Sequence, residues 1–349
     1  MTRPVALLAQ RIRRQGPLGF DQVVEAALYG EGGFFASGGG AGRDGADFIT
    51  SPEVGGLFGA VLARAFDEWW AELGRPDPFF VIEAGAGAGT LARAVLAASP
   101  ACLPALRYVL VERSAAHREA QKAHLDLELP AFVLGPSLHD NFDDQDGPSV
   151  EPGRGPLVTS LEGLPVGPFT GVILANELLD NLPFALLERR GSRWHEVRVG
   201  LTGDDRLAEV LVPASPLLAA EGDRLAPTAP QGARVPVQHQ AGEWLRDALG
   251  LLEAGRVVII DYAVTSTSEL AERPWGEWVR TYRAHGTAGP PLDRLGDTDI
   301  TVEVCIDQLA RVRRPALDRS QADFLTAHGL DALVAEARAA WQAAAASPD

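Results

Sequence analysis

The sequence predicts an α/β fold with a mostly parallel, Rossmann-like sheet. Three short apolar runs carry this prediction, at residues 79–83, 106–113 and 171–175. Continuous apolar runs of this length are typical of strands that are buried on both faces of a sheet. A fourth run, residues 256–263, has the same character. Ligands of such folds bind beyond the carboxyl ends of the strands, so the residues that follow each run are candidates for function.

Helices precede the first of these strands. Residues 4–15 and 20–29 place apolar side chains at helical spacing, and a glycine-rich stretch follows them. Ser51 is a plausible N-cap for a third helix, which should end near Leu73. We therefore assign residues 1–75 to an N-terminal helical lid.

A glycine-rich turn follows the first strand, which ends in Glu83. Its glycines are Gly85, Gly87 and Gly89, and a helix opens after them at Thr90. Glycines let the backbone approach a ligand, and a helix N-terminus offers free N–H groups. The spacing differs from the G-x-G-x-x-G of dinucleotide folds, and a carboxylate beside a pyrophosphate would be unfavourable.

A carboxylate at this position suits S-adenosylmethionine (SAM), which carries a sulfonium and an ammonium and no phosphate. The turn therefore looks like the SAM-binding turn of class I methyltransferases. A purely structural strand-to-helix connection is the alternative.

Polar side chains also follow the next two strands. Glu112 lies near the end of the second strand, where nucleoside-binding folds hold a ribose diol. Asn176, Glu177 and Asp180 follow the third strand and should face the same crevice as Glu83. Helix capping for Asn176 and a surface position for the acids are the alternatives.

The α/β alternation is interrupted after the third strand. Residues 185–212 alternate apolar and polar side chains as a β-hairpin does, so we assign residues 183–235 to an inserted α+β subdomain. Residues 264–298 are interpreted as a long polar loop. The remaining boundaries are 76–182 and 236–310 for the core, and 311–349 for C-terminal helices.

Composition excludes several kinds of partner. The chain of 349 residues has a formal net charge of −16, which argues against nucleic acid and against docking on anionic membranes. No run approaches the roughly 18 apolar residues of a membrane helix, so we expect no membrane insertion. Cys102 and Cys305 lie far apart in sequence, and no metal-ligand spacing occurs. With no targeting peptide evident, the expected location is cytoplasmic; the oligomeric state is not predicted.

Several stretches together resemble the MidA-like SAM-dependent methyltransferases. They are GPLGFDQVVEAALYGEGGFF, DFITSPE, VIEAGAGAGTLA, ILANELLDNLPF, IIDYA, RTYRAHG and DIT, in this order. The family includes the protein-arginine methyltransferase that acts in assembly of mitochondrial respiratory complex I. The chain departs from the family at Ala86 and Ala88, where a proline and a basic residue are usual, and at Ala263, where glycine is usual.

The resemblance implies a class I methyltransferase fold and assigns roles to particular residues. The residues that would hold SAM are Thr50, Ser51 and Glu53 as a closing segment, Glu83, Gly85, Gly87 and Thr90 at the methionine part, Glu112 at the ribose, and Ser160 and Leu161 at the adenine. The residues that would lie beside the transferred methyl are Asn176, Glu177 and Asp180.

The function that the resemblance implies is protein-arginine N-methylation linked to respiratory complex assembly. A guanidinium is protonated in water and presents five donors, so Glu177 and Asp180 could hold it bidentately and favour loss of a proton. Asp47, Glu53 and Asp261 are reserve candidates for this role. A SAM-binding scaffold with vestigial catalysis and a small-molecule methyltransferase are the alternatives, and a nicotinamide enzyme is the least favoured.

Overall fold

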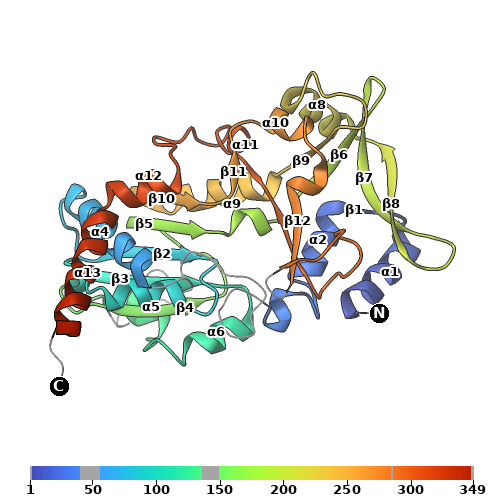
Figure 1. The fold of residues 1–349 in the computed structure, drawn as a ribbon. Helices are drawn as coiled ribbons and strands as arrows, with labels where there is room; N and C mark the ends of the chain where they lie inside the picture. Colours follow the sequence, from blue (N-terminus) through green and yellow to red (C-terminus); the bar gives the residue numbers. More distant parts are fainter. Residues whose placement is uncertain (1, 40–55, 136–148, 284–285, 347–349) are drawn as a thin grey trace.

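A five-stranded parallel sheet forms the centre of the chain (Figure 1), with strand order β10-β5-β2-β3-β4. The computed structural model describes residues 2–39, 56–135, 149–283 and 286–346. The strands of this sheet are β2 (Phe79–Ala84), β3 (Leu106–Val111), β4 (Leu157–Leu161), β5 (Phe169–Asn176) and β10 (Leu252–Ile260). The predicted α/β fold with a parallel sheet is confirmed.

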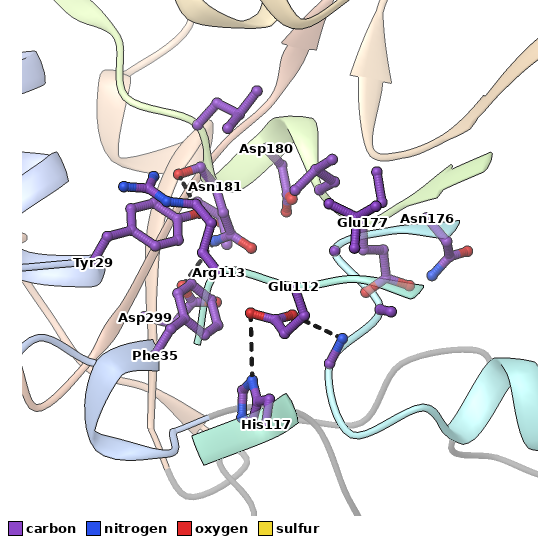
Figure 2. A pocket seen from close by; sticks show the side chains of 18 of the residues that line it. Tyr29, Phe35, Glu112, Arg113, His117, Asn176, Glu177, Asp180, Asn181 and Asp299 are labelled. Carbon is purple, nitrogen blue, oxygen red and sulfur yellow. Dashed lines mark hydrogen bonds and ion pairs between the residues drawn. The ribbon is translucent and has the colours of Figure 1, made fainter. Parts of the chain in front are cut away.

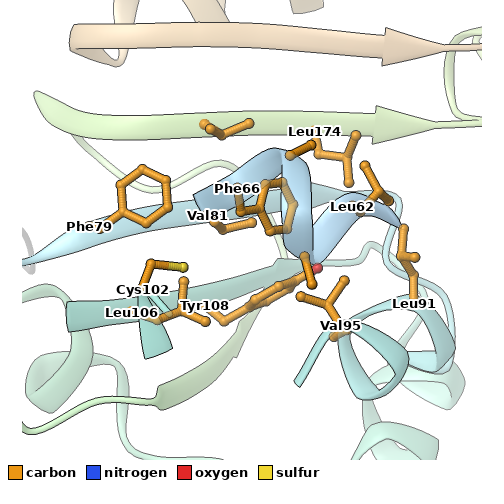
Figure 3. Close-up of a cluster of buried hydrophobic side chains, with 14 of the residues drawn as sticks. Leu62, Phe66, Phe79, Val81, Leu91, Val95, Cys102, Leu106, Tyr108 and Leu174 are labelled. Carbon is orange, nitrogen blue, oxygen red and sulfur yellow. The ribbon is translucent and has the colours of Figure 1, made fainter. Parts of the chain in front are cut away.

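Helices cover both faces of this sheet because β2 sends alternate side chains to opposite sides. Phe79 and Val81 pack in a core cluster with Phe66 of α4 (Figure 3). Phe80 and Ile82 pack in a second cluster on the other face. Each large apolar side chain buried in this way contributes about 1.5–3 kcal/mol.

Three helices supply the first cluster and two supply the second. On the first face lie α4 (Gly56–Glu72), α5 (Thr90–Ala97) and α12 (Gln321–Ala327), with part of α13 (Leu330–Ala346) packed against them. On the second face lie α7 (Pro130–Leu134) and α9 (His239–Gly250). Short helices also follow or precede the strands, namely η2 (Leu103–Ala105), α6 (Ala115–Gln121) and η4 (Leu179–Asn181).

A second sheet is antiparallel and lies beyond the carboxyl ends of the parallel strands (Figure 1). It contains β1 (Leu18–Gly19), β6 (Ala185–Arg190), β7 (Arg193–Leu201), β8 (Leu207–Pro213) and β9 (Arg234–Val237). The short β1 pairs with β7, so the N-terminal segment and the segment 185–237 share one sheet. The N-terminal α1 (Arg3–Gln15) and α2 (Phe20–Leu28) and the later α8 (Pro216–Leu225) pack around it.

The prediction of a long loop over residues 264–298 is wrong. That segment contains α10 (Thr267–Ala271), η5 (Trp275–Glu277), β12 (Val279–Arg283) and β13 (Gly286–Thr287). Strand β12 pairs with both β13 and β14 (Asp299–Val302). The pair β11 (Ala263–Val264) and β15 (Val304–Cys305) and the short α11 (Ile306–Leu309) complete this region.

One hydrophobic core joins the N-terminal helices to the two antiparallel sheets. Phe20 of α2, Val197 of β7 and Ile300 of β14 belong to the same buried cluster. By contrast, α4 belongs to the core of the parallel sheet, although all of it falls within residues 1–75, the predicted N-terminal lid. The division into domains therefore stays a prediction. In the described part of the chain, no helix is long and apolar enough to cross a bilayer.

Candidate active site

A cavity of about 640 Å³ lies where the carboxyl ends of the parallel strands meet the N-terminal helices and the sheet of β12 and β14 (Figure 2). Seven carboxylate side chains and two arginines are among its lining residues. An excess of acids in a cavity raises the local concentration of cations and disfavours anions. The cavity is therefore suited to a positively charged ligand.

The glycine turn forms one wall of this cavity. Gly85, Gly87 and Gly89 have φ angles of 72°, 52° and 80°, in the left-handed region that favours glycine. A Cβ on Gly89 would lie 2.9 Å from a methyl carbon of Leu125, whereas one on Gly87 would meet no atom of the described residues within 4 Å. The Gly87 backbone is thus open to a ligand.

Glu83 lies at the base of the turn and is only 4% exposed. The Tyr108 hydroxyl donates a 2.7 Å hydrogen bond to its Oε2 atom. Burial raises the pKa of Glu83 to about 7, with Tyr108 acting in the opposite direction and the charge of Glu112 adding to the increase. A bound cation near Glu83 would stabilise its ionised form.

Backbone N–H groups fix the carboxylate of Glu112. Gly87 N–H donates to Oε2 at 2.9 Å, and Ser114 N–H donates to Oε1 at 2.7 Å. The Nδ1 atom of His117 lies 4.0 Å from Oε1 (Figure 2). Gln121 in turn donates from Nε2 to the Gly87 carbonyl at 2.7 Å, so the turn and Glu112 form one hydrogen-bonded unit.

We predict that Glu112→Gln weakens SAM binding by about 10-fold or more. The variant loses the negative charge that attracts hydroxyl donors. Its NH2 group is a donor, so it would face one of the two backbone N–H groups that donate to the Glu112 carboxylate. Isothermal titration calorimetry with SAM tests this. Glu119→Gln, an exposed acid on the neighbouring helix, is the control. An unchanged dissociation constant would remove Glu112 from the cofactor site.

Strand β5 ends in a strained turn. Glu177 has a φ angle of 50°, and its N–H donates to the Ile260 carbonyl at 2.9 Å. A left-handed conformation at a non-glycine residue costs on the order of 1–3 kcal/mol and is enriched at functional sites. Asn176 and Asp180 flank this turn, and each has a buried Oδ1 atom without a hydrogen-bond partner in the described part of the chain. Both oxygens could accept hydrogen bonds from a ligand.

Asp261 stabilises this turn through hydrogen bonds to its backbone. Its Oδ2 accepts hydrogen bonds from the N–H groups of Leu179, at 2.9 Å, and Asp180, at 3.3 Å. Burial raises the pKa of Asp261 to about 6, although these backbone N–H groups lower it. Burial also raises the pKa of Asp180 well above its ordinary value, and the charge of Asp261 adds to this. Asp261 is not among the lining residues of the cavity, so it holds the turn and does not face the ligand.

Most of the residues predicted to form the site are brought together. The lining includes Glu83, Gly85, Gly87, Thr90, Glu112, Asn176, Glu177 and Asp180. Ser160 and Leu161 end β4 but are not lining residues, whereas the next three residues, 162–164, are. Asp47, Thr50, Ser51 and Glu53 lie outside the described residues. The roles assigned to all of these residues stay predictions.

Sequence reasoning missed one side of the cavity. Tyr29 and Phe35 stack at 5.5 Å, and the Arg113 guanidinium lies 4.3 Å from the centre of the Tyr29 ring. Asn181 and Asp299, which also line the cavity, are joined by a hydrogen bond from Nδ2 to Oδ1 of 2.8 Å. Of these residues, all but Arg113 lie inside the stretches that carry the family resemblance. Their place in those stretches is the sequence signal that could have identified them.

Comparisons with known proteins agree with this geometry. Residues 61–323 match the model of a family described as "Putative S-adenosyl-L-methionine-dependent methyltransferase". A solved structure from Burkholderia thailandensis, described as a "likely methyl transferase" bound to S-adenosyl-homocysteine, is 26% identical. It covers 95% of this chain and 82% of its own, with a TM-score of 0.77.

Curated relatives match this chain over smaller shares of their own length. A Drosophila melanogaster protein named protein arginine methyltransferase NDUFAF7 homolog, mitochondrial, is 28% identical over 58% of this chain and 46% of its own. The Rattus norvegicus protein arginine methyltransferase NDUFAF7, mitochondrial, is 25% identical over 82% of this chain and 64% of its own. The chain thus spans about half the length of most of these relatives. Their names contradict the expected cytoplasmic location, which was wrong because it relied on the absence of a recognisable targeting peptide.

The cavity fits SAM on its own geometry. Its volume is within the usual range for small-molecule sites, about 300–1,000 Å³. Glu83 is a buried acid whose raised pKa a ligand ammonium would lower, and the Gly87 backbone is open. The expected class I methyltransferase fold and the SAM cofactor are confirmed by the family match and by the solved structure with S-adenosyl-homocysteine. The chain belongs to this family of S-adenosyl-L-methionine-dependent methyltransferases.

Proposed function

We propose that this chain methylates arginine side chains of a protein, as a step in the assembly of a respiratory complex. The observation that carries the proposal is the acidic turn of Glu177 and Asp180, which lies in the same cavity as the glycine turn. The names of the curated relatives support a protein-arginine acceptor. The resemblance to the complex I assembly methyltransferase supports the role in assembly.

The cofactor end of the cavity would hold SAM through Glu83 and Glu112. When bound, SAM supplies an electrophilic methyl group on a sulfonium. Glu83 would attract the ammonium of its methionine part, and Glu112 would accept hydrogen bonds from the ribose hydroxyls. The backbone around Gly87 would lie against the same ligand, since no side chain of the described residues lies within 4 Å of a Cβ built there.

The acidic turn would bind and deprotonate the acceptor. A guanidinium nitrogen has no available lone pair while its charge is delocalised, so it must lose a proton as its bond to the methyl carbon forms. Glu177 and Asp180 would hold the guanidinium by charge-assisted hydrogen bonds, and Glu177 would take the proton. The carbon–sulfur bond breaks, and methylarginine and S-adenosyl-homocysteine are the products.

Transfer of a radiolabelled methyl group from SAM tests the proposal. The purified chain is incubated with labelled SAM and an extract from cells that lack the gene. Label in protein that hydrolyses to methylarginine is the expected result. Label only in small molecules would indicate a small-molecule methyltransferase, and no label at all would indicate a scaffold. The assembly role is tested separately, by asking whether the wild-type gene and a Glu177→Gln gene restore respiratory complex levels.

A further inference from the structure

An exposed tyrosine lines the cavity of the candidate active site. Tyr262 follows β10 after one intervening residue, and its exposed fraction is 58%. Of the large apolar and aromatic side chains that are exposed in the described part of the chain, it is the one that also lines the cavity. A ring in this position can contact a ligand without giving up packing in the core.

The parallel sheet determines where Tyr262 lies relative to the two turns. Strands β2, β5 and β10 are neighbours in this order, about 4.8 Å apart (Figure 1). Ala84 of β2 pairs with Ala175 of β5. Ile260 of β10 pairs with the next residue of β5, Asn176, so the three strands end level with one another. The acidic turn thus follows the middle strand, and the glycine turn and Tyr262 follow the strands to either side.

Hydrogen bonds join the backbone of Tyr262 to the acidic turn. Through Oδ2, the Asp261 carboxylate accepts from the N–H groups of Leu179 and Asp180, at 2.9 and 3.3 Å. Through Oδ1, it accepts from the N–H of Tyr262 at 2.8 Å. The Tyr262 carbonyl accepts from the N–H of Val304, also at 2.8 Å. Because these bonds use only backbone atoms of Tyr262, a change of its side chain leaves them in place.

The geometry of methyl transfer determines the side from which the acceptor approaches. The nucleophile must attack the methyl carbon opposite the sulfur, with the reacting atoms roughly 3–3.5 Å apart and their orbitals aligned. In the proposed arrangement, SAM lies on the side of β2 and β3, against Glu83 and Glu112, and its methyl group points to the acidic turn. The acceptor then reaches this turn from the side of β10, where Tyr262 lies.

We infer that Tyr262 binds the acceptor, with its ring packed on the plane of the guanidinium that the acidic turn holds. This inference rests on the proposed arginine acceptor. The N–H donors of a guanidinium lie in its plane, so carboxylates contact its edge and leave its faces open. A guanidinium is also more weakly hydrated than an ammonium and stacks on aromatic rings. Tyr262 is therefore a specificity residue for a planar cation.

The test measures the binding of butylguanidinium to the whole chain saturated with S-adenosyl-homocysteine. Tyr262→Leu removes the ring and keeps an apolar side chain, whereas Tyr262→Phe keeps the ring and removes the hydroxyl. We expect the leucine variant to bind butylguanidinium about 5-fold or more weakly and the phenylalanine variant to stay within about 2-fold of wild type. Both should bind S-adenosyl-homocysteine as wild type does. Trp341→Leu, at a 72% exposed aromatic residue of α13, is the matched control.

A fluorine label shows whether the ring itself contacts the probe. The chain contains four tyrosines, so labelling with 3-fluorotyrosine gives few resonances, and Tyr262→Phe identifies the one from residue 262. This resonance should shift as butylguanidinium is added and shift less with butylurea, which is planar but neutral. An unchanged resonance at saturating butylguanidinium would contradict the contact.

Several binding results would also overturn the inference. They are wild-type protein that does not bind butylguanidinium, wild-type affinity in Tyr262→Leu, a loss in Tyr262→Phe as large as in Tyr262→Leu, or butylurea bound as tightly as butylguanidinium. Failure of the arginine-methylation proposal is a distinct result. Wild-type protein would then bind butylguanidinium through Tyr262 but leave no methylarginine in the labelling experiment.

Discussion

Replacing Glu177 with glutamine is expected to lower turnover by about 10²–10³-fold while SAM affinity changes by less than about 3-fold. The carboxylate is the group that we propose accepts the guanidinium proton, and proton transfer by a positioned side chain contributes about 10²–10⁴-fold to rate. Glutamine keeps the length and the strained φ angle of 50°, so the turn itself should persist. We propose that the cofactor is held by a different wall of the cavity, which Glu83 and Glu112 line.

Single-turnover transfer from labelled SAM to the acceptor protein measures this effect, with calorimetry for SAM affinity. Glu119→Gln serves again as the control for loss of a surface carboxylate. A fall in SAM affinity that accounts for the whole loss would move Glu177 to the cofactor site. Turnover equal to wild type would exclude Glu177 from the chemistry.

Glu83→Gln is expected to have opposite effects on stability and on cofactor binding. Burial raises the pKa of Glu83 from 4.5 to about 7 in the folded chain. Between these values the folded state binds more protons than the unfolded state, so the free energy of unfolding falls as pH rises through this window. Above pH 7 the ionised Glu83 lowers stability by about 3 kcal/mol, and glutamine removes that cost.

Binding of SAM should show the reverse dependence, because a ligand ammonium favours ionised Glu83. Wild-type affinity for SAM is expected to rise by about 10-fold between pH 6 and pH 8, whereas Glu83→Gln should bind weakly at both values. Urea unfolding at pH 5 and pH 8 and calorimetry at pH 6 and pH 8 provide the measurements. Tyr108→Phe, which removes a hydrogen bond to Glu83, should move the wild-type transition to higher pH. A SAM affinity independent of pH in wild type would contradict the assignment.

The parallel sheet and one wall of the site were predictable from the sequence for a local reason. The apolar runs around Phe79, Leu106 and Val172 are buried on both faces, and parallel strands place their carboxyl ends at one edge. Glu83 and Glu112 were therefore expected at the same edge of the sheet once their strands were recognised. The structure adds that the two strands are direct neighbours, with Ala84 opposite Val111.

The opposite wall was not predictable because it depends on pairing between distant segments. The polar stretch around Thr281 becomes a strand only through its pairing with Ile300 of β14, and neither segment alternates clearly. The same pairing places Asp299 beside Asn181, 118 residues away in sequence. The left-handed conformation of Glu177 likewise has no local signal, since it follows from the hydrogen bond to β10.

Arg113 follows Glu112 directly in the chain, and this adjacency has a consequence for the order of events. Arg113 is fastened to Glu25 and Tyr29 of the N-terminal region, and Ser114 donates a 2.8 Å hydrogen bond to the carbonyl of Phe35. We expect that a nucleoside bound at Glu112 orders these contacts, because they are made by the next two residues of the chain. The methyl donor would then bind before the acceptor.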